Sequence, residues 1–230
     1  AAVQGTEEPE RAPQQAVDTG SLAPRAPPAV AEQGTGDDPT VPPPTVLRTA
    51  DPTLTGGRKE VAFIDTGVAD WQVLAEGVKP GVEVVLLDAD QDGLAQMAAW
   101  AQGKSGYDAI HVLSHGDVGV VKLGTLTLDI GTAGARATDL EALGATLTED
   151  GDLLLYGCNV AGVGGQDFLT FIAELTAADV AASIDDTGSS SLGGNWQLES
   201  NDGDIESSLT DGSDFTEYSH LLATITFSAA

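Results

Sequence analysis

Short, nearly continuous apolar segments that alternate with helical patterns are the feature that most restricts how this chain can fold. The apolar segments occupy residues 61–64, 82–87, 109–113, 153–156, 179–183 and 196–198. Apolar side chains recur every three or four positions in residues 68–78, 92–102, 137–147 and 166–175, and residues 120–128 alternate as in a β-hairpin. Strands that are apolar throughout and alternate with helices are typical of parallel sheets covered on both faces. We therefore predict an α/β fold with a mostly parallel, six-stranded sheet and helices on both faces.

The first 52 residues differ from the rest, because they hold ten of the eleven prolines of the chain. Proline fixes φ and lacks a backbone N–H group, and this stretch has few large apolar side chains to bury. The pattern predicts a disordered, Pro-rich linker at residues 1–57 and a folded domain at residues 58–210. Residues 211–230 are expected to be a C-terminal extension or the start of a next module.

Charge and apolar content exclude several classes of function. The chain has 9 basic and 36 acidic residues and a net charge of −27, so nucleic-acid phosphates and anionic membranes would repel it. Its longest apolar runs are too short to cross a bilayer. With one cysteine, the chain can form neither an internal disulfide nor a thiolate zinc cluster. We expect no nucleic-acid partner and no membrane insertion.

Two residues that follow successive predicted strands carry the most informative chemistry. The third strand is followed by His115 and Gly116, and the fourth by Gly157 and Cys158. Functional groups of parallel sheets gather at the carboxyl ends of the strands, so neighbouring strands would place both side chains in one crevice. An imidazole beside a thiol activates it as a nucleophile, and the N–H groups of Gly116 and Cys158 could stabilise an oxyanion. The alternative is a buried, inert thiol and an unrelated histidine.

These motifs resemble those of two groups of proteins. The segments HVLSHGD and LLLYGCN resemble the strands that end in histidine and cysteine in the caspase and gingipain-like clan of cysteine peptidases. A second resemblance is closer and covers about residues 60–206. It is to an N-terminal domain of giant bacterial surface adhesins, long catalogued as a domain of unknown function. The strings that carry it are FIDTGVADWQVL, VVLLDADQDGLAQMA, AIHVLSHGDVGVVKLG, LLLYGCNVAG, ADVAAS and LGGNWQLE.

The resemblance implies a caspase-like sheet in which Cys158 is the nucleophile and His115 is the general base and acid. It implies a cysteine endopeptidase within an exported adhesin at the bacterial cell surface. The parent polypeptide would be the substrate, and other adhesin modules would be its partners. Asn159 and Val160 depart from the strict caspase signature, so a specificity for aspartate is not carried over. The alternative function is a non-catalytic interaction or retention module on a peptidase-like fold.

Three carboxylates are candidates for substrate binding. In the wider clan, an acidic residue after the first or fifth strand can line the pocket for the residue that precedes the scissile bond. Asp65, Asp185 and Asp186 match these positions. An aspartate in this pocket would favour arginine or lysine by charge pairing. The alternative is that these aspartates cap turns.

The proposed chemistry requires no cofactor, but the acidic composition makes calcium a possible ligand. The DADQDG string opens like an EF-hand loop, yet its twelfth position is Ala99 instead of glutamate, and Asp92 fits a helix N-cap better. Other acidic clusters are better candidates for calcium, among them Asp202, Asp204 and Glu206. His111 is expected to be a packing residue, because His115 is the only other histidine near it and a metal site needs a third ligand.

Overall fold

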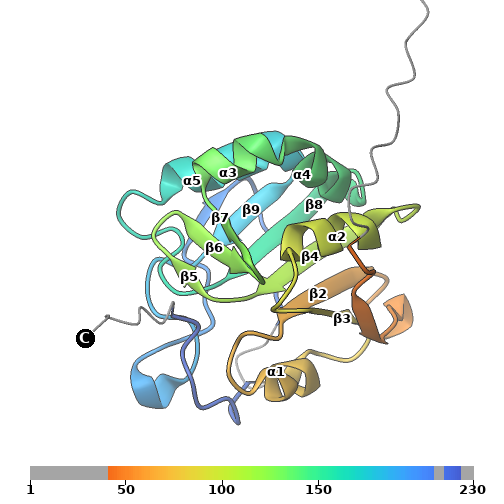
Figure 1. The fold of residues 1–230 in the computed structure, drawn as a ribbon. Coiled ribbons are helices and arrows are strands. Elements are labelled where there is room, and N and C mark those ends of the chain that lie inside the picture. The colour runs from red at the N-terminus through yellow and green to blue at the C-terminus, as the bar shows by residue number, and fades with distance from the viewer. Residues whose placement is uncertain (1–40, 210–214, 224–230) are drawn as a thin grey trace, which may run out of the picture. The chain divides into compact units, whose positions relative to one another are not determined.

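The centre of the structure is a seven-stranded sheet in the order β1-β3-β2-β4-β8-β9-β10 (Figure 1). The computed structural model describes residues 41–209 and 215–223, all of which belong to one compact unit. Neighbouring strands are parallel from β3 to β9, whereas β1 and β10 are antiparallel to their neighbours at the two edges. The strands are β1 (Thr45–Arg48), β2 (Glu60–Asp65), β3 (Glu83–Leu87), β4 (Tyr107–Leu113), β8 (Leu147–Tyr156), β9 (Asp179–Ala182) and β10 (Ser200–Asp202).

A second, three-stranded antiparallel sheet follows β4. It consists of β5 (Gly116–Asp117), β6 (Val120–Leu123) and β7 (Leu126–Leu128), so the predicted hairpin at residues 120–128 is confirmed. The helices are α1 (Trp71–Gly77), α2 (Gly93–Ala101), α3 (Ile130–Ala135), α4 (Ala137–Gly144) and α5 (Gln166–Thr176), with short 3₁₀ turns at Pro52–Leu54 and Ser190–Leu192. No helix in the described ranges is long and apolar enough to cross a membrane.

The two faces of the large sheet are covered differently. Helices α2, α3, α4 and α5 lie over one face and α1 over the other (Figure 1). The face with α1 is completed by residues beyond β10, among them the buried side chains of Phe215, Tyr218 and Leu222. Residues 215–223 therefore pack on the domain, although they lie beyond the boundary predicted at residue 210.

The α/β class, the mostly parallel sheet and the helices on both faces are confirmed, but the prediction of six strands is wrong. Residues 196–198 form no strand; Trp196 and Leu198 pack against the core as side chains, and the adjacent β10 makes the ladder instead. An apolar pattern reports burial, and burial does not require strand pairing. Strand β1 lies within the range predicted as linker, and it is mostly exposed at the sheet edge, so its sequence carries little apolar signal. The prediction for residues 1–40 lies outside the described residues.

Two titratable side chains buried in the sheet, His111 and Glu60, lie against each other. His111 is fully buried on β4, and its Nε2 lies 3.2 Å from Glu60 Oε2. Burial lowers the pKa of His111, since the charged imidazolium is poorly solvated there. Burial alone would raise the pKa of Glu60, but its interactions with His111 and Lys79 lower it to about 2. His111 thus packs in the core beside Glu60, as the sequence predicted. Asp92 also caps α2 as predicted, with Oδ1 accepting the Ala95 N–H at 2.9 Å.

Candidate active site

The topology brings the histidine and cysteine motifs to the same end of two neighbouring strands. Strands β4 and β8 are parallel neighbours in which Leu113 lies opposite Tyr156, so His115 and Cys158 both lie two residues beyond this pair. The backbones make close contact here: a Cβ atom on Gly157 would lie 3.1 Å from both the N and Cα atoms of Gly116. Glycine at both positions therefore permits this approach, because any side chain would separate the two turns.

The two N–H groups that the sequence suggested as oxyanion donors point to one acceptor. The Gly116 N–H donates to the carbonyl oxygen of Leu222 at 2.9 Å, and the Cys158 N–H donates to the same oxygen at 3.3 Å. Leu222 lies 64 residues beyond Cys158 in the sequence, since 222 − 158 = 64. A carbonyl oxygen that accepts two converging backbone N–H groups is polarised in the way that a tetrahedral oxyanion would be stabilised.

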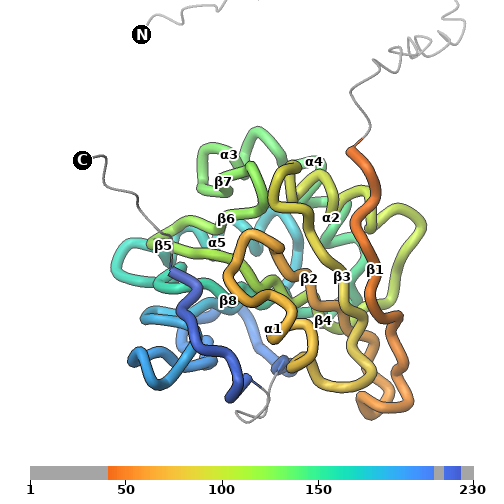
Figure 2. Tube along the Cα trace, turned by 60° about the horizontal axis from the view of Figure 1, so that its bottom comes forward, coloured from red at the N-terminus to blue at the C-terminus, as the bar shows by residue number. Residues whose placement is uncertain are grey.

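The segment that carries this carbonyl is extended and paired along the loop at residues 187–189. The Leu222 N–H donates to Thr187 O at 2.9 Å, and the Ser189 N–H donates to His220 O at 2.8 Å. Gly188 forms an antiparallel bridge with Leu221, while Ala223 bridges to Gly116 of β5 in parallel. Figure 2 shows the segment, in dark blue, running beside β5. Residues 220–223 are therefore paired as an added peptide strand would be.

The Cys158 thiol is buried and hydrogen-bonded to the backbone of Thr187. The side chain is 2 % exposed; its Sγ accepts the Thr187 N–H at 3.2 Å and donates to Thr187 O at 3.4 Å. Burial raises the pKa of the thiol to about 11, the negative charge of Asp186 adds to this, and the Thr187 N–H partly offsets it. Among the described residues, the buried Nδ1 atom of His115 has no hydrogen-bond partner. The thiol proton is thus directed to Thr187 O in this arrangement.

We expect the folded chain to react slowly with alkylating reagents at neutral pH. A pKa raised from 9.0 to about 11 leaves roughly a hundredfold less thiolate at pH 7.5, and burial restricts access further. Intact mass spectrometry after timed addition of iodoacetamide should show alkylation at least a hundredfold slower in the folded chain than in the chain unfolded in urea. Equal rates in the two states would show that the thiol is not held as described.

Asp65, the first carboxylate suggested for substrate binding, is buried at the end of β2. Its Oδ1 accepts the Gly67 N–H at 2.7 Å and its Oδ2 accepts the Gly124 N–H at 2.6 Å. These bonds join the end of β2 to the turn between β6 and β7. A substrate-binding role for Asp65 remains a prediction, and in this arrangement both oxygens serve the backbone.

Asp185 and Asp186, the other two suggested carboxylates, lie in the loop after β9. Asp185 is exposed and accepts hydrogen bonds from Asn195 Nδ2 at 3.0 and 3.1 Å. Asp186 accepts from Asn159 Nδ2 at 3.2 Å, next to the cysteine, and is near enough to influence the thiol. Both carboxylates thus organise the loop that continues into residues 187–189. Their binding of substrate also remains a prediction.

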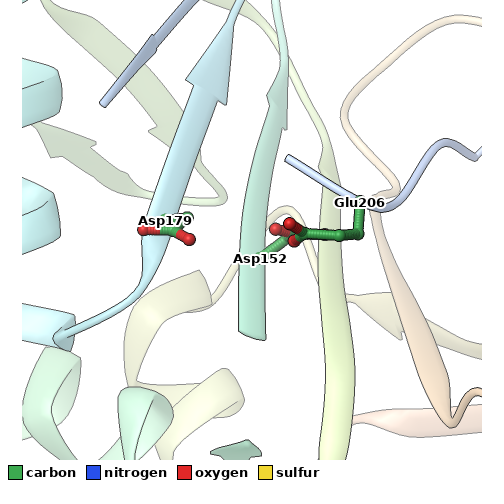
Figure 3. Close-up of side chains that lie close together, drawn as sticks. All are labelled: Asp152, Asp179 and Glu206. Atoms are coloured by element: carbon green, nitrogen blue, oxygen red, sulfur yellow. The ribbon is translucent and has the colours of Figure 1, made fainter. Parts of the chain in front are cut away.

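Three carboxylates that could hold a cation gather where β9 begins, beside the middle of β8. Ligand oxygens of Asp152, Asp179 and Glu206 all lie within 4.8 Å of one another (Figure 3). Asp152 is fully buried, and within the described residues its oxygens accept no hydrogen bond, although Arg58 Nη2 lies 3.6 Å from Oδ2. Burial and then the neighbouring negative charges raise the pKa values of Asp179 and Glu206. Calcium binding, which the sequence suggested for a group including Glu206, remains a prediction.

We expect Glu206→Gln to raise the melting temperature slightly, on the order of 1–2 °C, at neutral pH in the presence of a chelator. A raised folded-state pKa means that the charged form is disfavoured in the fold, so the cluster destabilises the chain above that pKa. The gain should disappear as the pH falls through the carboxyl range and the wild-type groups become neutral. Glu141→Gln, an exposed position on α4, is the matched control. A lower melting temperature for Glu206→Gln without calcium would contradict repulsion.

Sequence reasoning missed the residues that complete the site. Thr187 holds the thiol, and Leu222 supplies the carbonyl to the two N–H groups. The run of small residues at 187–191 and the isolated apolar residues at 221–222 were the signals available, but neither pattern indicates a partner. Asp152 carried a similar weak signal, an acid directly before an apolar strand. Only the packing of distant segments identifies these groups.

Comparison with known proteins adds one finding. A family model described as "Domain of unknown function (DUF4347)" matches residues 61–222. The match begins within β2 and ends at Leu222, so it includes both strand-end motifs and the segment that reaches them. No curated protein matches the chain.

Proposed function

Because the chain belongs to the family described as a domain of unknown function (DUF4347), which assigns no activity, we propose a function from the site itself. The chain is a cysteine endopeptidase domain that processes its own parent polypeptide. The observation that carries this proposal is the convergence of the Gly116 and Cys158 N–H groups on one peptide carbonyl oxygen, that of Leu222. Two aligned donors at a cysteine, in the turn beside a histidine, are what acyl transfer through a thioester requires.

The roles follow from the positions of the groups. Cys158 is the nucleophile, and His115 takes the thiol proton and later returns it to the leaving amine. The Nδ1 atom of His115, buried without a partner among the described residues, is the nitrogen that would receive the proton. A Cys–His dyad is sufficient for a thiol, since a thiolate is intrinsically nucleophilic. The order of strands ending in histidine and cysteine supports a caspase-like arrangement of this sheet.

The biological setting is part of the same proposal. The resemblance of residues 60–206 to the N-terminal domains of giant adhesins supports export to the bacterial cell surface, with other adhesin modules as neighbours. A strongly acidic chain would remain soluble there and could meet calcium. Self-processing within such a protein would separate one module from another.

The proposal is tested by following the intact mass of the purified chain over time, beside the variant His115→Gln. We expect two complementary fragments, a first-order rate that does not depend on protein concentration, and a rate about 10²–10⁴-fold lower in the variant. A rate proportional to concentration would indicate cleavage between molecules. If the wild type stays whole throughout the time course, the domain is a non-catalytic interaction module.

A further inference from the structure

We propose that the bond cleaved is Leu222–Ala223 and that the site selects leucine as the residue before the scissile bond. This inference rests on the proposed peptidase function and adds to it the substrate position and the residue preference. It comes from residues 220–223 themselves, which pair with residues 187–189 and reach the N–H groups of Gly116 and Cys158.

The two oxyanion donors identify the peptide bond that the nucleophile would attack. In acyl transfer, the nucleophile attacks the carbonyl carbon whose oxygen lies between the oxyanion donors. In this structure that oxygen belongs to Leu222, at 2.9 Å from the Gly116 N and 3.3 Å from the Cys158 N. Ala223, on the other side of the bond, bridges to Gly116 and so lies where a leaving group would be held.

Backbone pairing holds the residues before the bond. Hydrogen bonds at 2.8 and 2.9 Å join His220 and Leu222 to Ser189 and Thr187. A Cβ atom on Gly188 would lie 2.4 Å from His220 O, so glycine at that position allows the two segments to approach. His220 is further positioned by its Nε2, which lies 2.8 Å from Asp70 Oδ2. Pairing of this kind recognises an extended strand with little dependence on side chains, so selectivity must come from the buried residue.

The buried residue is Leu222, whose side chain is 0 % exposed. It lies in the same apolar cluster as Ile64, Val68 and Cys158. A lysine or arginine here would bury an unpaired charge, which is strongly unfavourable. Asp65 directly follows Ile64, and its two carboxylate oxygens already accept the N–H groups of Gly67 and Gly124. This buried position therefore favours leucine. The sequence had instead suggested arginine or lysine, from the three aspartates considered for substrate binding.

The reaction at this bond is balanced by solvent water alone. The Cys158 sulfur forms a bond to the Leu222 carbonyl carbon while the thiol proton passes to His115. The C–N bond to Ala223 then breaks, and His115 returns the proton to the departing amine, leaving a thioester. Water attacks the thioester with His115 as base, which releases the thiol and a Leu222 carboxylate. Backbone pairing with residues 187–189 would hold that carboxylate in place, so the product would block the site after a single turnover.

The test maps the cleavage site in the full chain and changes the buried residue. We expect a new N-terminus at Ala223 and an N-terminal product that ends at Leu222, both lost in Cys158→Ala. Leu222→Lys should slow cleavage at this bond by at least about a hundredfold. Leu54→Lys, the same change at a leucine that is 62 % exposed, is the matched control and should be cleaved like the wild type. Circular dichroism and thermal melting establish that each variant is folded.

Because Leu222 is part of the core, Leu222→Met provides a second variant that keeps the pocket filled. It should be cleaved after residue 222, less than tenfold more slowly than the wild type. Cleavage at another bond that still requires Cys158 would overturn this inference and leave the peptidase function intact. Retention of cleavage after residue 222 in a folded Leu222→Lys variant would overturn the leucine preference. The absence of any cleavage of the wild-type chain would overturn both proposals.

Discussion

Replacing Cys158 by alanine should reduce the rate of chain cleavage by at least about 10³-fold, because the nucleophile is removed while the rest of the site remains. The variant keeps the backbone N–H of residue 158, so the Leu222 carbonyl should stay bound. The measurement is intact mass spectrometry of the wild type and the variant over the same time course, with the full chain in both samples.

The control for this variant is Cys158→Ser, which retains a hydroxyl that can donate to Thr187 O, as the thiol does. Both variants should be equally inactive, and the alanine variant should be less stable by about 1 kcal/mol, the usual contribution of a buried hydrogen bond. Urea denaturation measures this difference. Cleavage of Cys158→Ala at the wild-type rate would exclude Cys158 as the nucleophile, and a contaminating peptidase would be recognised because it cleaves all variants alike.

Gly116→Ala should displace one of the two proposed oxyanion donors, the N–H of residue 116. An added Cβ would lie 2.6 Å from Val160 Cγ2 and 2.9 Å from both Cys158 O and Gly157 C. Two of these neighbours are backbone atoms that cannot rotate away, so the turn must shift and carry its N–H away from Leu222 O. We expect cleavage to slow by about 10²–10³-fold, as for the loss of one oxyanion donor, and stability to fall by about 1–3 kcal/mol. Cleavage kinetics and urea denaturation measure the two effects.

Gly134→Ala is the matched control for this substitution. Its Cβ would lie 3.7 Å from Phe171 Cζ, an ordinary contact, and Gly134 lies within α3. Alanine is the better helix former by about 1 kcal/mol, so this variant should be slightly stabilised and cleaved at the wild-type rate. If Gly116→Ala is cleaved as fast as Gly134→Ala, the Gly116 N–H is not an oxyanion donor.

The sequence predicted those features that depend on residues close together along the chain. Apolar strands alternating with amphipathic helices predicted the parallel α/β sheet, and Asp92 was identified as a helix cap from its position alone. The same kind of signal failed at Trp196 and Leu198, which are partly buried without belonging to a strand. It also failed at β1, which pairs at an exposed edge and has no buried side chain.

Some residues of the candidate site were predictable from the sequence, and others were identified only from the structure. His115, Gly116 and Cys158 could be selected from the sequence, because each follows a buried strand and parallel strands end at the same edge of a sheet. The contacts of Thr187 with the thiol and of Leu222 with the two N–H groups depend on segments that are far apart along the chain. Backbone hydrogen bonds between distant segments leave no pattern of side chains in the sequence from which they could be predicted. The sequence thus determined which groups could do chemistry, and the tertiary structure alone decided which peptide bond they meet.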